Sequence, residues 1–198
     1  MKKRKSSKKV DKWKLKKWYT VVAPDIFDKK EIGEIISSDP SNLENRLVPV
    51  PATDLIGRSK PEWDYSTFNF RVESVKDNTV YTKMVGLEVA FSYLRALSKR
   101  RRTVMHDVID VKTKDGYDVR LKLMVVTLKK VSSVVEKNLR KELINKVLEL
   151  AKTKTYQELI RDIIDGRFTA TIFKHVNRIN PIQHLVIKKL VLNEEFAA

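Results

Sequence analysis

The sequence predicts an α+β fold, and the order of its hydrophobic patterns is the reason. Alternating apolar residues, typical of strands, dominate residues 18–130, whereas apolar residues three or four apart, typical of helices, dominate residues 131–180. A last alternating run at 184–192 predicts one strand that returns after the helices. Strands first and helices later, with one strand returning, indicate an α+β fold. We therefore expect a single α+β domain over residues 18–198.

The first strand predictions rest on alternation and on turn residues. A strand begins at Trp18, and we expect Trp18 and Tyr19 to belong to the core. Residues 66–75 alternate between apolar and polar side chains before KDN leads into a second run, TVYTKMV. Two such runs joined by a short polar turn predict a β-hairpin. Pro49 and Pro51 lack the backbone N–H that a central strand needs, so they exclude a central strand here but permit an edge strand.

A helix and a second hairpin are predicted next. Apolar residues spaced three or four apart over 90–97 predict a helix, with the basic run KRRR at 99–102 at its C-terminal end. The runs TVMHDVIDVKTK and YDVRLKLMVVTL then flank Asp115 and Gly116. Asp-Gly suits a tight hairpin turn because both residues tolerate positive φ. Alternation in the second run predicts that one face of this hairpin is buried.

Three helices are predicted in the C-terminal third. The apolar stripe of the first consists of Val135, Leu139, Leu143, Val147 and Leu150. The second is expected to start at Thr155, because Glu158 lies three residues later and completes a capping box. Gly166 is its expected C-terminal cap. A short third helix is expected over residues 169–176.

Positive charge is concentrated at the N-terminus. The chain of 198 residues has 41 basic and 25 acidic side chains, a net charge of +16, and its first seventeen residues hold ten Lys or Arg against Asp11. Like charges repel and almost no apolar surface is available there, so residues 1–17 are predicted to form a disordered basic tail.

The absence of cysteine excludes disulfides and zinc knuckles. Without a signal peptide or an apolar run of about 18 residues, we expect a soluble cytosolic protein.

This charge distribution predicts nucleic-acid binding, because each cation that neutralises a phosphate releases counterions. The first alternative is that these charges only face solvent and bind nothing. The second, binding to an acidic membrane, is disfavoured because the tail lacks an apolar face. Trp13 is expected either to stack on an unpaired base or to pack against the body. Arginines 100–102 could clamp phosphates with their guanidinium forks. The predicted RNA-binding residues are Lys2, Lys3, Arg4, Lys5, Lys8, Lys9, Lys12, Trp13, Lys14, Lys16, Lys17, Lys99, Arg100, Arg101, Arg102, Lys129 and Lys130.

No motif in the sequence indicates catalysis. There is no G-x-x-x-x-G-K-[ST], G-x-G-x-x-G or H-E-x-x-H. The second hairpin carries an acidic cluster, composed of Asp107, Asp110, Asp115 and Asp118. Two-metal nucleases use such carboxylates, but Lys112, Lys114 and Arg120 lie close enough in sequence to neutralise them. We therefore expect no enzyme, no metal and no cofactor, and keep a metal-dependent nuclease as a third hypothesis.

Two longer segments carry a resemblance to a known family. WYTVVAPDIF at 18–27 and IDVKTKDGYDVRLK at 109–122 resemble the small-subunit ribosomal protein family S-three-A-e of archaea and eukaryotes, also called e-S-one. The lysine-rich start, the helix followed by KRRR and the ending INPIQHLVIKKLVL fit the same family. The resemblance covers roughly residues 10–192.

The resemblance implies a β-barrel-like antiparallel body with packed C-terminal helices. It also implies a structural place in the cytoplasm, on the platform of the small ribosomal subunit, near the mRNA exit and the 3′ end of the ribosomal RNA. The implied partners are small-subunit ribosomal RNA, neighbouring platform proteins and mRNA near the exit, with no membrane. A free RNA-binding or RNA-processing factor outside the ribosome is the alternative, because it would share the same charge distribution.

Overall fold

The computed structural model describes residues 13–57 and 61–194. Its strands are β1 (Lys17–Val22), β2 (Glu31–Ser37), β3 (Leu47–Pro51), β4 (Ser66–Lys76), β5 (Thr79–Val89), β6 (Val104–Lys112), β7 (Asp118–Thr127) and β8 (Ile182–Asn193). Its α-helices are α1 (Ala52–Ile56), α2 (Pro61–Asp64), α3 (Phe91–Leu97), α4 (Ser133–Lys152), α5 (Tyr156–Asp165) and α6 (Arg167–Asn177). Short 3-10 helices are η1 (Asp25–Phe27) and η2 (Pro40–Leu43).

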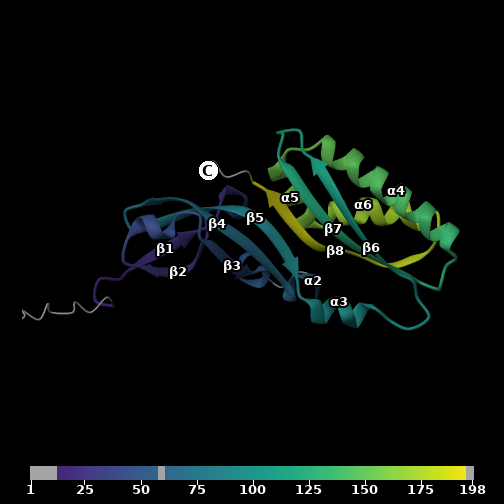
Figure 1. Ribbon diagram of the computed structural model, residues 1–198, viewed down its shortest axis with the longest axis horizontal. Helices are drawn as coiled ribbons and strands as arrows, with labels where there is room; N and C mark the ends of the chain where they lie inside the picture. Colours follow the sequence, from purple (N-terminus) through teal and green to yellow (C-terminus); the bar gives the residue numbers. More distant parts are fainter. Residues whose placement is uncertain (1–12, 58–60, 195–198) are drawn as a thin grey trace, which may run out of the picture. The chain divides into compact units, whose positions relative to one another are not determined.

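The strands form an eight-stranded sheet in the order β2-β1-β5-β8-β7-β6, and β4 pairs with both β3 and β5 (Figure 1). β1 and β5 are parallel, whereas the pairs β1–β2, β5–β8, β6–β7 and β7–β8 are antiparallel. The helices α4, α5 and α6 follow the first seven strands in the chain, and β8 comes after them. The α+β prediction is therefore confirmed. β3, which contains both prolines, pairs with β4 alone among the described strands, as an edge strand does.

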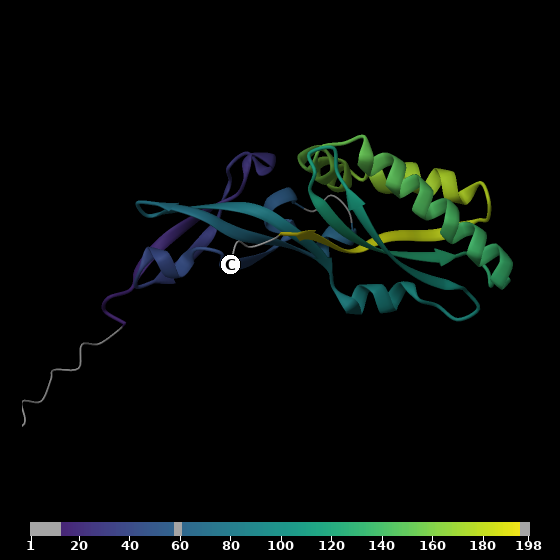
Figure 2. The same cartoon turned by 45° about the horizontal axis from the view of Figure 1, so that its top comes forward.

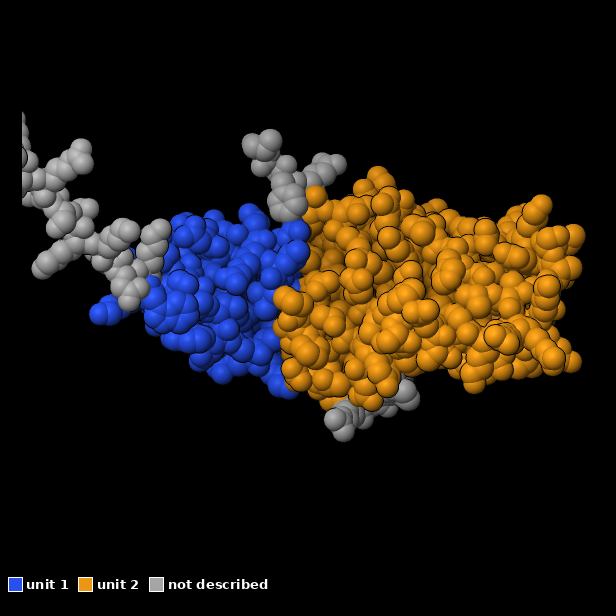
Figure 3. Space-filling model, turned by 60° about the horizontal axis from the view of Figure 1, so that its bottom comes forward, with its two compact units in different colours: residues 1–48, 70–83 blue, residues 49–69, 84–198 orange. Residues whose placement is uncertain are grey.

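The chain divides into two compact units. Unit 1 comprises residues 1–48 and 70–83, and unit 2 comprises residues 49–69 and 84–198 (Figure 3). The single domain over 18–198 stays a prediction. The predicted RNA contacts from Lys2 to Lys12, and most of the tail predicted to be disordered, lie outside the described residues.

The core of unit 1 is built on β1. Tyr19 and Val21 of this strand are buried in one cluster with Leu43 and Val80. Side chains alternate along a strand, so Trp18 points to the other face and is 60% exposed. The expectation that Tyr19 belongs to the core is confirmed, and the same expectation for Trp18 is wrong.

In unit 2, helices α4, α5 and α6 cover one face of the strands β6, β7 and β8, and α3 lies on the other side (Figure 2). Alternation along β7 supplies apolar side chains to both faces. Met124 and Val126 pack with Leu94 of α3. Leu123 and Val125 point to the opposite face, beneath the longer helices, and are also buried. The β7 strand is therefore the centre of this core.

Two local sequence signals act where they were predicted. Thr155 and Glu158 exchange hydrogen bonds at the start of α5 as a capping box, and Gly166 ends that helix with a φ of 77°. Asp115 and Gly116 lie in the turn between β6 and β7, where Gly116 has a φ of 82°. The predicted capping box and the predicted hairpin are both confirmed, because each depends on residues close together in sequence.

The basic run at 99–102 does not belong to a helix. α3 ends at Leu97, and Ser98 has an extended backbone with φ −79° and ψ 96°. Arg101 then takes a left-handed backbone with a φ of 64°, which an α-helix cannot accommodate. The prediction that this run finishes the helix is wrong, because the run forms the loop between α3 and β6.

Candidate nucleic-acid interface

Unit 1 presents the described end of the basic N-terminal segment. Trp13 is 62% exposed, and the Lys16 Nζ atom lies 4.3 Å from the centroid of its ring. The Lys16 N–H donates to the Trp13 carbonyl oxygen at 3.1 Å, which closes a turn ahead of β1. Lys14 and Lys17 are exposed as well. An exposed indole held by a local turn can stack on an unpaired base, so this exposure favours stacking over packing against the body.

Trp18 is a second exposed indole, which sequence reasoning assigned to the core. It follows Lys17 in β1 and is the register partner of Ile36 in β2. The signal that could have found it is the alternation of β1: once Tyr19 and Val21 point inward, Trp18 has to point outward. Unit 1 therefore presents two indoles among lysines.

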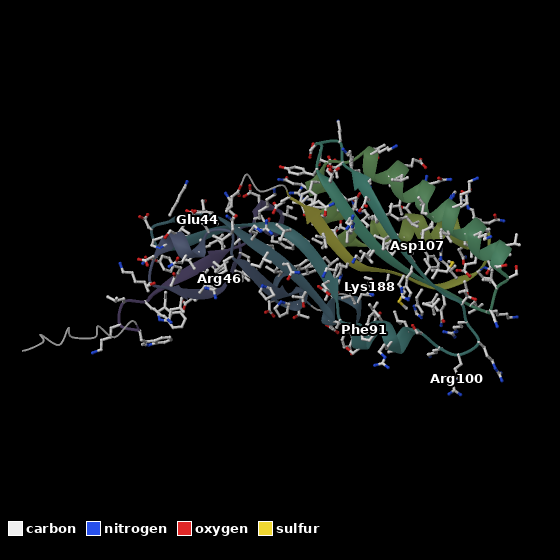
Figure 4. All side chains as sticks on the ribbon, in the orientation of Figure 1. Glu44, Arg46, Phe91, Arg100, Asp107 and Lys188 are labelled. Carbon is white, nitrogen blue, oxygen red and sulfur yellow. The ribbon has the colours of Figure 1, made fainter. Side chains whose placement is uncertain are left out.

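Unit 2 carries the second basic segment, the loop 99–102. Lys99, Arg100 and Arg101 are exposed, whereas Arg102 is half-buried and its Nη1 atom has no hydrogen-bond partner in the described part of the chain. Figure 4 shows Arg100 projecting outward from this loop. None of these four side chains forms an ion pair with a carboxylate of the described residues. Their charge is available to an external anion.

Two threonines join this loop to the segment that follows β7. The Thr103 N–H donates to Thr127 Oγ1 at 3.0 Å, and the Thr127 N–H donates to the Thr103 carbonyl oxygen at 3.0 Å. The Thr127 hydroxyl also donates to the Lys129 carbonyl oxygen at 2.6 Å. These bonds bring the loop 99–102 to the same end of the β6–β7 hairpin as Lys129 and Lys130, which are both exposed. We call this end of the hairpin, opposite its turn, the basic end.

The positive potential of the basic end extends to β8. Burial lowers the pKa of His184, and the charges of Arg102 and Lys99 lower it further. The imidazole is therefore held in its neutral form near neutral pH. The strand register agrees with this effect, because Thr103 at the end of the loop bonds to Thr127, next to Val126, which pairs with His184.

Arg178 is a further cation of the basic end, and sequence reasoning missed it. It is exposed at the C-terminal cap of α6. The Leu128 N–H donates to the Pro181 carbonyl oxygen at 3.1 Å, so the connection from α6 to β8 lies against the segment after β7. The sequence signal was a basic residue two positions before Asn180-Pro181. Only the pairing of β7 with β8 shows that this residue lies at the basic end.

At the opposite end of the hairpin, which we call the turn end, two of the cations are paired with carboxylates. Arg120 donates to both carboxylate oxygens of Asp110, with distances of 2.6 and 3.0 Å, and this hydrogen bonding lowers the pKa of Asp110. Lys112 pairs with Asp118 at 3.7 Å. The predicted neutralisation is confirmed for Lys112 and Arg120, whereas Lys114 forms no ion pair with a carboxylate of the described residues. Within residues 13–57 and 61–194, no group of His, Asp or Glu side chains is arranged to hold a metal ion, and no helix is long and apolar enough to span a membrane.

Asp107 differs from the other acidic residues of the hairpin because it is only 6% exposed. It lies on β6 (Figure 4), and its Oδ1 atom is 2.8 Å from Arg140 Nε of α4. Burial raises the pKa of Asp107, while the Arg140 charge opposes that rise. This pair therefore connects α4 to the sheet, and its role is structural.

Comparison with known proteins gives one consistent family. The family model described as the Ribosomal S3Ae family matches residues 4–195. A small ribosomal subunit protein eS1 of Archaeoglobus fulgidus is 31% identical over 193 residues, covering 98% of this chain and 92% of that protein. Proteins of the same name from Methanothermobacter thermautotrophicus and Sulfurisphaera tokodaii are 30% and 32% identical, covering 93% and 92% of this chain and 94% and 93% of their own lengths.

Proposed function

The chain belongs to the Ribosomal S3Ae family, and we propose that it is a structural constituent of the small ribosomal subunit that binds ribosomal RNA. Its relatives of nearly equal length are named as small-subunit proteins. The role is structural, without catalysis, and its place is in the cytoplasm with the ribosome. The small-subunit RNA and the proteins beside it are the expected partners.

The observation that carries RNA binding is the basic end of the hairpin. Two loops distant in sequence contribute Lys99, Arg100, Arg101, Lys129 and Lys130 to one exposed surface. Hydrogen bonds between the loops fix the spacing of these cations before RNA arrives. A preorganised set of cations binds phosphates at a lower entropic cost than the same residues on a flexible chain.

The mode of recognition follows from the side chains. Arginine forks and lysine ammoniums bind phosphate oxygens, and side chains cannot read the deep major groove of A-form RNA. We therefore expect recognition of RNA shape through its backbone. Trp13 and Trp18, both exposed in unit 1, add stacking on unpaired bases. The predicted contacts from Lys2 to Lys17 complete the proposed RNA-binding set.

The finer location follows the family resemblance. We propose the platform of the small subunit, near the mRNA exit and the 3′ end of the ribosomal RNA, with neighbouring platform proteins as partners and mRNA nearby. The surface chemistry supports this proposal, because a body with cations on both units suits a site where RNA segments converge. Each cation lowers the repulsion between approaching phosphate backbones.

A sucrose-gradient separation of cell lysate at about 0.5 M salt tests the proposal, because salt at this concentration screens weak phosphate contacts. An integral constituent is expected to migrate with the small subunit. Recovery only at the top of the gradient would overturn the ribosomal role and favour a free RNA-binding factor.

Deleting residues 2–17 tests the tail separately. The slope of log affinity against log salt should fall by about 0.7–0.9 for each phosphate contact removed.

A further inference from the structure

Strand β8 is paired on both sides for only part of its length. β7 pairs with it from Ile182 to Asn193, but β5 pairs only with Lys189, Leu190 and Val191. No other described strand pairs with β8, so its β5-side edge is open over residues 183–187. An open edge presents backbone N–H and C=O groups that can pair with an added strand.

A cavity of about 330 Å³ lies along this open edge, a volume at the lower end of the range for ligand pockets. All five residues 183–187 line it, although successive side chains of a strand point to opposite faces. A cavity that touches all five therefore reaches the edge of the strand, where an additional strand would lie, and it extends beneath α5 and α6. Val89, Trp63, Ala170 and Phe173 form the other walls.

Two lining residues hold polar atoms that lack partners. Trp63 is only 5% exposed, and its Nε1 atom has no hydrogen-bond partner within the described residues. The same holds for the Oε1 atom of Gln183. Leaving a buried polar group without a partner is unfavourable, so both atoms favour a ligand that can bond to them. One donor and one acceptor beside an open strand edge match the alternating groups of a polypeptide main chain.

The charge near β8 indicates which peptide fits. His184 pairs with Val126, a residue that packs on the α3 side of the sheet. Arg102 and Lys99 act electrostatically on His184, so the groove is electropositive on this side. Glu62 lines the groove from α2 and also acts on Tyr93 of α3, so it offsets only part of this positive charge. Because the two cations outnumber it, we place the ligand's acidic side chain on the α3 side.

We propose that this edge of β8 is a docking groove for an extended peptide segment of a partner protein. The segment adds as a strand along residues 183–187 and directs an acidic side chain toward Lys99 and Arg102. Main-chain pairing gives the affinity and the side-chain pockets give the selectivity. The groove borders the basic end and shares Lys99 and Arg102 with the predicted RNA-binding residues, but the main-chain pairing along residues 183–187 needs no RNA.

The test uses the purified full-length chain and a blocked, fluorescein-labelled peptide of alternating pattern, EVFVTV. We expect saturable binding by anisotropy, with the largest amide NMR shifts at residues 183–187. Ala170→Trp fills the groove from an exposed position of α6 and should weaken binding by about tenfold or more. Thr171→Trp adds the same side chain at the next exposed residue, which does not line the groove, and should change the affinity by less than about twofold.

Variant peptides test the mode of binding. EVPVPV lacks two main-chain donors and should not bind, and KVFVTV should bind several-fold more weakly than EVFVTV because its lysine is repelled. Equal affinities for the two tryptophan variants, shifts centred elsewhere, or no peptide binding at about 1 mM would overturn the proposal. A short single-stranded RNA that displaces the peptide, and whose own binding is weakened by Ala170→Trp, would also overturn the proposal. The groove would then be a nucleic-acid site.

Discussion

The two ends of the β6–β7 hairpin differ in whether their cations are paired with carboxylates. At the turn end, Arg120 is matched by Asp110 and Lys112 by Asp118. At the basic end, the loop 99–102 and its neighbours have no carboxylate partner among the described residues. Both ends belong to one rigid element with continuous pairing from Val104 to Lys112. The difference therefore arises from side chains alone.

This difference teaches where an external partner is needed. A surplus of cations at fixed positions raises the local potential and costs stability through mutual repulsion. Ion pairs at the turn end relieve that cost within the chain. At the basic end the repulsion remains until an anion binds, so the basic end is the better candidate for RNA contact although both ends are exposed.

Charge reversal should produce the largest effect. Arg100→Glu with Arg101→Glu replaces two phosphate contacts by repulsion, so the affinity for a small-subunit ribosomal RNA fragment should fall about a hundredfold at about 0.1 M salt. The matched control, Lys112→Glu with Lys114→Glu, makes the same change in net charge at the turn end and should cost less than about threefold. Filter binding measures both. Equal losses would mean that net charge, not location, determines the affinity.

Breaking the ion pair between Asp107 of β6 and Arg140 of α4 should have the next largest effect. Arg140→Met leaves the Asp107 carboxylate buried without its cation, which costs about 3–5 kcal/mol for a fully buried pair. Because Arg140 is 44% exposed, we expect a loss of about 2 kcal/mol in the free energy of unfolding at pH 7. Urea unfolding followed by circular dichroism measures it.

The pH dependence of this loss has a definite sign. Burial raises the pKa of Asp107 in the folded protein, and removing Arg140 raises it further. A carboxyl with a raised folded pKa keeps its proton at low pH at no cost and reduces stability as the pH rises through that pKa. The difference between Arg140→Met and the parent should therefore be smallest below about pH 4 and largest above the folded pKa. A difference independent of pH would show that Asp107 is not the cause.

The two threonines at the ends of the hairpin separate stability from binding. Thr127→Val removes the acceptor for the Thr103 N–H, and Thr113→Val removes the acceptor for the Tyr117 N–H. Each change should cost about 1–2 kcal/mol, since both threonines are buried. Only Thr127→Val loosens the basic end, so it alone should weaken RNA binding, by about three- to tenfold. Melting curves and filter binding on both variants check this, and equal RNA affinities would contradict it.

Local signals in the sequence were enough for elements whose partners are near in the chain. The Asp115–Gly116 turn and the Thr155–Glu158 capping box are such cases. The exposure of Trp18 was missed, although the buried neighbour Tyr19 implies it once β1 is known to have a single core face. The sequence error came from treating adjacent strand residues as equivalent.

The basic end could have been predicted from the sequence, but the open edge of β8 could not. Extending the hairpin register by three and four positions beyond Val104 and Val126 sets Arg101 level with Lys129 and Arg100 level with Lys130. By contrast, β8 pairs with β5 and β7 across gaps of about a hundred and about sixty residues. No local propensity reports where such a pairing stops, so the docking groove follows only from the structure.

The smallest effect is expected for the exposed pair at the turn end, and it completes the comparison. Arg120→Met breaks both hydrogen bonds to Asp110, but water and salt replace them, so the melting temperature should stay within experimental error at physiological ionic strength. RNA affinity should also be unchanged, because that guanidinium is already occupied by a carboxylate. A measurable loss of RNA binding would mean that phosphate competes successfully with Asp110. Matched charge would then no longer distinguish the turn end from the basic end, and the RNA-binding surface would have to extend along the whole hairpin.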